Sequence, residues 1–126
     1  MHALRGIEIY NNRPVLYGLG EFIRQMDVIG LAGQGGPERS VGPPDAEMPV
    51  KLESIIAITE FADGNLKEVR LHPIETRYDA EKLSLRGIPR IALPETVQRI
   101  LGRLQELSAP LGTMIEIQGD IGVIRP

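Results

Sequence analysis

The sequence predicts an α+β fold that combines antiparallel β-hairpins with one amphipathic helix. Residues 7–17, 55–71 and 115–124 each carry apolar, often β-branched residues on both sides of a turn containing Asn or Gly, which is typical of hairpins. Residues 94–108 instead place apolar side chains at helical spacing. The 126 residues are enough for one domain. We therefore expect a single domain over residues 1–126.

The composition limits the classes of partner and chemistry. Hydrophobic residues make up 42% and charged residues 25%, as in ordinary globular domains, and the few aromatics imply an aliphatic core. The formal net charge is −3 with no basic stripe, so the sequence favours no nucleic-acid partner. Without Cys, disulfides, thiolate zinc sites and a Cys nucleophile are excluded. We see no membrane-length apolar run and no signal-peptide pattern, and the cellular location stays open.

The first expected hairpin begins with Ile7 and Ile9 alternating with polar or aromatic neighbours. Asn11–Asn12 is the expected turn, because Asn tolerates a positive φ better than other non-glycine residues. Pro14 cannot donate a ladder hydrogen bond, so it belongs at a strand start or on an outward-facing edge. A Gly- and Pro-rich loop follows at about 30–50, and we expect it to be mobile or ordered by a partner.

The second expected hairpin contains the most apolar strand, "SIIAITEF", and a turn at Asp63–Gly64–Asn65. Ile55 and Ile56 are adjacent, so both faces of this strand carry apolar groups. This pattern predicts an inner strand that is covered on both sides. Residues 77–93 carry mixed signals and are expected to form an irregular connection.

The expected helix spans residues 94–108, and Pro94 suits its first turn while Pro110 ends it. Gly102 lowers helix stability by about 1 kcal/mol relative to Ala, and a close backbone approach would explain its presence. A third short hairpin turns at Gln118–Gly119–Asp120. The residues expected to form the apolar stripe of the helix are Val97, Ile100, Leu101, Leu104 and Leu107.

Few residues are candidates for chemistry. Two His, His2 and His72, cannot by themselves form a structural zinc site. His72 is expected to be a half-exposed residue near a strand end, with a role as ligand or base as the alternative. Asp63 and Asp120 lie in predicted turns, where Asp usually serves the turn geometry. None of the serines Ser40, Ser54, Ser84 and Ser108 has a nucleophile-elbow motif around it.

Several blocks of the chain resemble one bacterial family. The opening "HALRGIEIYNNRPVLYGLGEF" resembles the second half of "GHGPHVLRGIEIYKGRPIFYSLGNF", a pattern of CapA-type capsule-synthesis proteins, also called poly-γ-glutamate biosynthesis proteins. The later blocks "AITEFADGNLKEVRLHPIE", "RGIPRIALPETVQRILGRLQELSAPLGT" and "IEIQGDIGVIRP" resemble the C-terminal part of the same family. In the opening block, Gly18 replaces a Ser and Glu21 replaces an Asn of the family pattern.

The resemblance implies a calcineurin-like metallophosphoesterase, whose β-sandwich surrounds two divalent metal ions (Mn, Zn, Fe or Mg). His2 matches the last His of the family's late ligand motif, and the remaining ligands would precede Met1. We therefore expect the C-terminal portion of a capsule or poly-γ-glutamate biosynthesis protein, inactive and metal-free by itself. Its uncovered strands would favour a homo-oligomer, most simply a symmetric dimer. A non-catalytic scaffold or protein-interaction domain is the alternative, and a remnant without independent function is a third.

Overall fold

The computed structural model describes residues 3–23, 53–77 and 80–126, without the side chain of Leu83. The elements are β1 (Ile7–Tyr10), β2 (Arg13–Leu16), β3 (Glu53–Ala62), β4 (Asn65–Thr76), the 3₁₀ turn η1 (Leu83–Leu85), β5 (Pro89–Ile91), α3 (Pro94–Ser108), the 3₁₀ turn η2 (Ala109–Leu111), β6 (Glu116–Gln118) and β7 (Ile121–Ile124). The predicted α+β class is confirmed. The expected loop at 30–50 lies outside the described residues.

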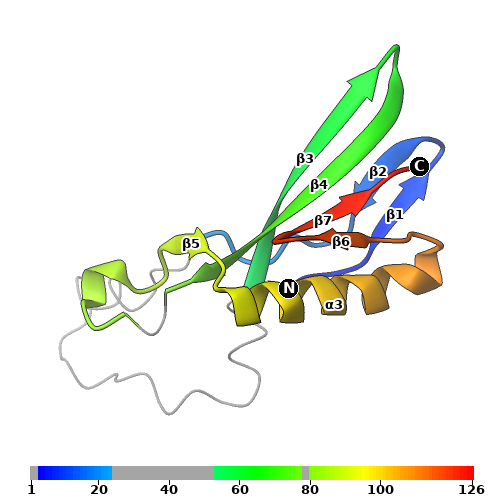
Figure 1. The fold of residues 1–126 in the computed structure, drawn as a ribbon. Helices are drawn as coiled ribbons and strands as arrows, with labels where there is room; N and C mark the ends of the chain where they lie inside the picture. Colours follow the sequence, from blue (N-terminus) through cyan, green and yellow to red (C-terminus); the bar gives the residue numbers. More distant parts are fainter. Residues whose placement is uncertain (1–2, 24–52, 78–79) are drawn as a thin grey trace.

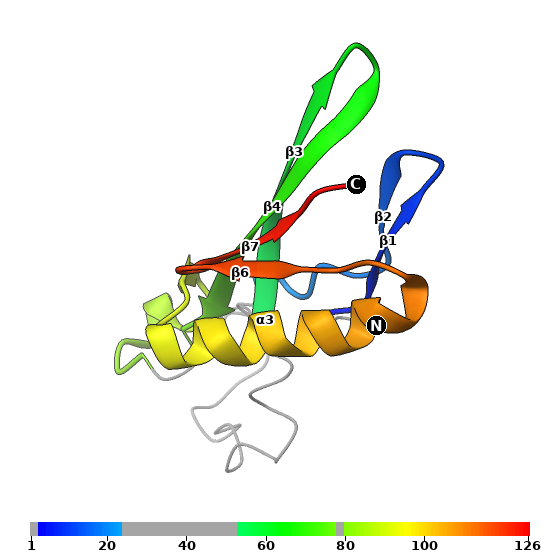
Figure 2. The same ribbon diagram turned by 45° about the vertical axis from the view of Figure 1, so that its right-hand side comes forward.

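The strands form two antiparallel sheets (Figure 1). One sheet contains β1 and β2, and the other has the order β3-β4-β7-β6 with β5 also pairing with β4. The β3–β4 hairpin extends beyond the helix as a long arm, with β1–β2 beside it (Figure 2). All three predicted hairpins are therefore confirmed.

The tight turns explain why these hairpins form where they do. Asn11 and Asn12 have φ of 45° and 59°, and Asp63 and Gly64 have φ of 52° and 74°. Two consecutive positive φ values are the signature of the type I′ turn, which matches the twist of a hairpin. The second turn is thus Asp63–Gly64, and Asn65 is already the first residue of β4.

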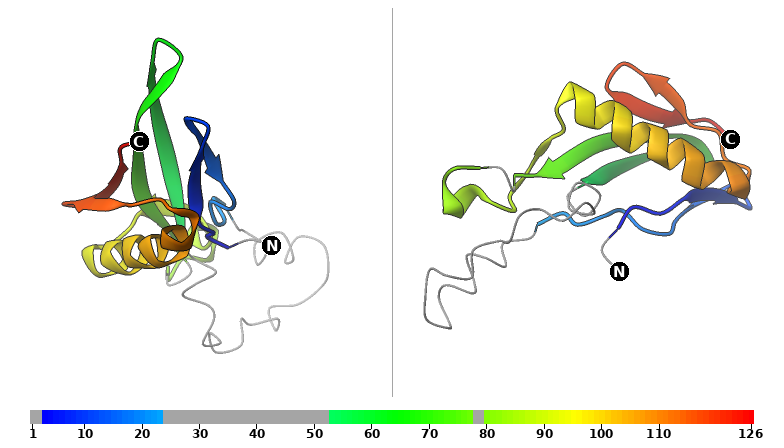
Figure 3. Two further views of the ribbon diagram at one scale, coloured as in Figure 1. Left: turned by 90° about the vertical axis from the view of Figure 1, so that its right-hand side faces the viewer. Right: turned by 90° about the horizontal axis from the view of Figure 1, so that it is seen from below.

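One face of the five-stranded sheet, here called the inner face, is covered by both α3 and β1–β2 (Figure 3). Alternate residues of β3 and β4, including Ile55, Val69 and Leu71, meet the helix stripe in a single apolar cluster. The opposite side of the sheet is called the outward face. The other members of the cluster are Leu4, Ile7, Leu66, Ala92, Val97, Ile100, Leu101, Leu104, Ile115 and Ile124.

The helix confirms most of the predicted stripe but not its last member. Leu104 is fully buried, whereas Leu107 is 38% exposed, so the expectation for Leu107 is wrong. The adjacent Ser108 is buried instead, because β1 approaches the end of α3 and the Ile7 N–H donates to Ser108 Oγ at 3.0 Å. A Cβ at Gly102 would meet nothing within 4 Å, so no close approach explains that glycine.

Among the residues that the structure describes, β3 is an edge strand, which contradicts the predicted inner strand. It pairs with β4 along its length. On its other side, the described residues form only two contacts: the bridge between Gly20 and Ser54, and the hydrogen bond that the Ile55 N–H donates to the Leu19 oxygen at 3.0 Å. Its outward-facing Ile56 and Ile58 are 40% and 48% exposed. Apolar residues on both faces therefore did not mean burial of both faces.

The connection after β4 is only partly irregular. Residues 89–91 form β5, which pairs with the end of β4, and the sequence pattern did not predict this short strand. Across the part of the chain that the structure describes, we find no helix that is both long enough and apolar enough to span a membrane.

Candidate functional site

The predicted metal ligand His2 lies outside the described residues, so its role stays a prediction. Ser40 also lies outside the described residues. Among residues 3–23, 53–77 and 80–126, no group of three His, Asp or Glu side chains is arranged to hold a metal ion.

The opening block that resembles the capsule-synthesis family folds back on itself. Leu4 pairs with Leu19, and the Arg5 N–H donates to the Gly18 oxygen at 3.0 Å. A Cβ at Gly18 would lie only 2.6 Å from the Ala3 oxygen, so a Ser at this position would force the backbone apart. Glycine at position 18, where the family pattern has Ser, is therefore required by the close approach of the two segments.

The segment after Gly18 is fixed against the start of β3. Gly20 has φ of 87°, a conformation that favours glycine, and its Cα faces the backbone of Glu53 and Ser54 so closely that no side chain fits. Ser54 Oγ donates to the Leu19 oxygen at 2.6 Å. Glu21, which replaces the family's Asn, is buried. The two departures thus lie in a tightly packed segment.

The remaining candidate residues from the sequence do not form a catalytic arrangement in the structure. His72 on β4 stands opposite Ile56, half-buried, and its Nε2 has no hydrogen-bond partner in the described part of the chain. Ser108 accepts the Ile7 N–H, whereas Ser84 is exposed. Asp63 lies in a tight turn, as predicted. None of these residues belongs to a recognisable catalytic group.

A buried group of charges, here called the basal charge cluster, was not predicted. It comprises Glu53, Glu75, Arg90, Arg99 and Arg103. Glu53 is 1% exposed and accepts from Arg99 Nε at 2.5 Å and from Arg103 Nη1 at 3.0 Å. Glu75 stands opposite Glu53 in the sheet and accepts from Arg90 Nε at 2.7 Å.

The cluster joins α3 to the inner face of the sheet at the start of β3. A buried carboxylate is tolerated only when it is paired and hydrogen-bonded, and both Glu53 oxygens receive an arginine here. The only signal in the sequence was the spacing of Arg99 and Arg103, which are four residues apart and so share one side of the helix. Their common partner is 46 residues or more away, and no local pattern identifies it.

The outward face carries a second set of charges, the outward ion-pair row, formed by Glu60, Glu68, Arg70, Glu116 and Arg125. Arg70 pairs with Glu60 at 3.1 Å and with Glu68 at 3.0 Å. Arg125 pairs with Glu68 at 2.9 Å and with Glu116 at 3.1 Å. Exposed pairs of this kind each contribute little to stability.

The tips of the two long hairpins are also joined. Asn12 Nδ2 donates to Asn65 Oδ1 at 2.9 Å, and Arg13 Nη1 donates to the Gly64 oxygen at 2.8 Å. The Arg13 guanidinium lies 5.5 Å from the centre of the Phe61 ring, within range of a cation–π contact. These contacts hold β1–β2 against the β3–β4 arm.

No protein-family model matches the chain. Two curated relatives, the uncharacterized proteins y4sH and y4uA of Sinorhizobium fredii strain NBRC 101917 / NGR234, are each 36% identical to it over 98% of the chain. The match covers 32% of each relative. The chain thus spans about a third of the length of the curated relatives it matches.

Proposed function

We propose that this chain is a portion of a CapA-like capsule or poly-γ-glutamate biosynthesis protein and that the intact protein is a metal-dependent phosphoesterase-like enzyme. In this view, the described residues support a site whose metal ligands lie elsewhere, and the 126 residues alone are inactive. His2 would contribute one ligand for a divalent metal ion. The proposal rests on the ordered blocks of resemblance along the chain.

The observation that carries the proposal is the fixed position of the opening block. Residues 4–5 pair with residues 18–19, and the next residues are locked against β3 by the close approach at Gly20. A sheet edge anchored in this way is a suitable support for ligands, because metal sites need first-shell residues on rigid elements. The relatives' greater length leaves room for further ligands in a longer protein.

The test compares the chain with the whole y4sH protein. Both are assayed with bis-p-nitrophenyl phosphate and added Mn²⁺, Zn²⁺ or Mg²⁺, and their bound metal is measured by mass spectrometry. We expect turnover and bound metal only in the whole protein, and loss of both when the residue matching His2 is changed to Ala. A metal-free, inactive y4sH would contradict the proposal, as would turnover by the 126-residue chain.

The second candidate is a non-catalytic interaction domain that self-associates, and the outer edge of β3 favours it. The Ile55 N–H points to this edge, so the backbone groups of Ala57 and Thr59 point there too, because alternate residues of an antiparallel strand face the same neighbour. In the described residues, nothing pairs with them. Such an edge favours pairing with a second copy of the strand.

Proline at position 59 tests this candidate. Thr59→Pro removes the N–H that faces outward and leaves the neighbouring bonds to β4 in place, whereas Thr59→Val keeps the edge intact. We expect a dimer by sedimentation equilibrium for the parent chain and for Thr59→Val, and a monomer for Thr59→Pro. A parent chain that stays monomeric at 13.9 kDa at micromolar concentration would exclude self-association through this edge.

A further inference from the structure

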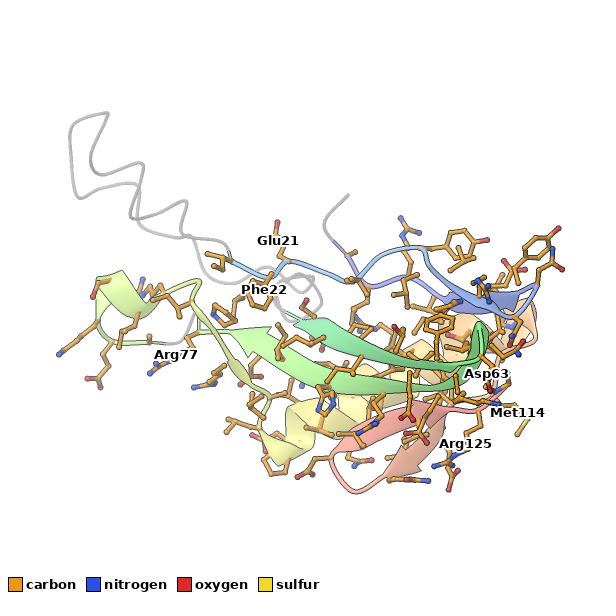
Figure 4. The ribbon with its side chains drawn as sticks, turned by 90° about the horizontal axis from the view of Figure 1, so that it is seen from above. Glu21, Phe22, Asp63, Arg77, Met114 and Arg125 are labelled. Carbon is orange, nitrogen blue, oxygen red and sulfur yellow. The ribbon has the colours of Figure 1, made fainter. Side chains whose placement is uncertain are left out.

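The inference concerns Arg77, the residue that follows β4. Its N–H donates to the Ile88 oxygen at 3.1 Å and so continues the pairing of β4 with the β5 strand. Arg77 lies two positions after Glu75, with only Thr76 between them, so both side chains belong to the inner face by alternation. Figure 4 shows Arg77 just beyond the end of β4, beside the segment that leads to β5.

The two inner-face carboxylates at this end of the sheet, Glu53 and Glu75, are held by other arginines. The carboxylate of Glu75 is held by Arg90, with distances of 2.7 Å from both Nε and Nη2 to Oε1. Glu53 is held by the two arginines of α3. In the described ranges no ion pair reaches Arg77, and its Nε is buried without a hydrogen-bond acceptor.

A buried guanidinium donor without an acceptor requires a physical explanation. Arginine stays charged at any physiological pH, so it cannot avoid the cost of burial by losing its proton. Buried, unsatisfied polar groups in native structures are explained by strain, by a catalytic role, or by a bound water or ion. The planar fork of arginine fits the oxygens of a phosphate or carboxylate group, which would supply the acceptor and the missing negative charge together.

We propose that Arg77 anchors a binding site for an oxyanion, a phosphate or carboxylate group, where β4 ends and β5 pairs with it. The proposal does not depend on the proposed function. Its ligand approaches on the inner face, next to the Glu75–Arg90 pair. The exposed Lys82 in the same segment carries the same charge without burial, and it provides a matched control.

The experiment titrates the metal-free chain with inorganic phosphate and, separately, with acetate at constant ionic strength, followed by amide chemical shifts. We expect saturable binding by the parent chain, at least tenfold weaker binding by Arg77→Gln, and a change of less than twofold for Lys82→Gln. Arg77→Lys keeps the charge without the fork, so it should also bind more weakly than the parent chain. Circular dichroism identifies a variant that has not folded. If Arg77→Gln has not folded, the comparison of Arg77→Lys with the parent chain tests the proposal.

The outcomes distinguish phosphate from acetate as the ligand, and a specific site at Arg77 from a response to net charge. Tighter binding of phosphate than of acetate assigns the site to phosphate groups, and the reverse order assigns it to carboxylates. A parent chain that binds neither anion below 20 mM overturns the proposal. Equal weakening by Arg77→Gln and Lys82→Gln also overturns it, since the response would then reflect net charge alone.

Discussion

The inner and outward faces of the five-stranded sheet are carried by the same strands, yet they are stabilised in different ways. On the inner face, aliphatic residues such as Leu71 and Val69 are fully buried beneath α3 and β1–β2, and the buried carboxylate of Glu53 is paired with partly exposed arginines. On the outward face, the charges of the outward ion-pair row lie at the surface and Ile56 and Ile58 remain exposed. The same alternation therefore leads to a core on the inner side and, on the outward side, to a face where Ile56 and Ile58 stay exposed although Ile74 and Val123 are buried.

The difference indicates where the free energy of folding comes from. Burial of apolar area contributes about 25 cal/mol per Å², so the inner face dominates. Exposed ion pairs contribute roughly 0–1 kcal/mol each, so the outward row sets local geometry more than stability. Substitutions matched in chemistry but placed in different surroundings test this comparison.

The largest effect is expected at the helix stripe. Leu104→Ala should lower the free energy of unfolding by about 2–5 kcal/mol, because Leu104 is completely buried against the inner face. The same change at Leu107, which is 38% exposed on the same helix, should cost about 1 kcal/mol or less. Urea denaturation measures both, and equal losses would show that the two positions do not differ in burial.

A smaller effect is expected from the buried charges. Glu53→Gln leaves Arg99 and Arg103 without their carboxylate, and we expect a loss of about 1–3 kcal/mol. The loss stays below that for a fully buried pair because these arginine side chains are 45% and 27% exposed and can reach water. Glu60→Gln removes the same charge from the outward face and should cost less than about 0.5 kcal/mol. A larger loss for Glu60→Gln than for Glu53→Gln would reverse the comparison.

The smallest effect concerns the solvent side of β1–β2. The Tyr17 hydroxyl donates to Glu8 Oε2 at 2.6 Å, and this hydrogen bond is the main cause that raises the pKa of Tyr17. Glu8→Gln should therefore lower the pKa of Tyr17, measured from the pH titration of its ring Cζ chemical shift. An unchanged midpoint would mean that the hydrogen bond does not persist in solution.

The same hydrogen bond predicts how the stability of the fold changes with pH. The folded state raises the pKa of Tyr17, so it favours the neutral phenol. This contribution is fully present below the pKa of the unfolded chain and is lost as the pH rises through the higher folded pKa. Because the pair is at the surface, the resulting pH dependence should be slight, and it should be smaller still in Glu8→Gln.

The local features of the fold could be predicted from the sequence because their causes are local. Asn11–Asn12 and Asp63–Gly64 form turns through the φ preferences of those residues, and the helix follows from the spacing of its apolar residues. The order of the strands was not accessible in this way. The exposure of Ile56 depends on whether a further layer covers the outward face of β3, and the apolar pattern carries no information about such a layer.

The candidate sites were predicted less well than the fold. Glu53 looked like an ordinary polar strand residue, and only the tertiary arrangement brings Arg99 and Arg103 to it. The free donor of Arg77 depends on Glu75 being held by Arg90, which requires the pairing of β4 with β5. These features arise from contacts between distant segments, so residue type and spacing alone could not reveal them.

The hydrogen bond from Ile7 to Ser108 has a consequence for the order of folding. It joins residues 101 positions apart, and closing a flexible loop of that length costs about 4 kcal/mol of chain entropy before any contact compensates for it. The β3–β4 hairpin and the run from α3 to β7 close over much shorter distances, so they can assemble first. The β1–β2 hairpin, which precedes the other described strands in the sequence, is then among the last to dock, and it should acquire protection from amide exchange after the helix does.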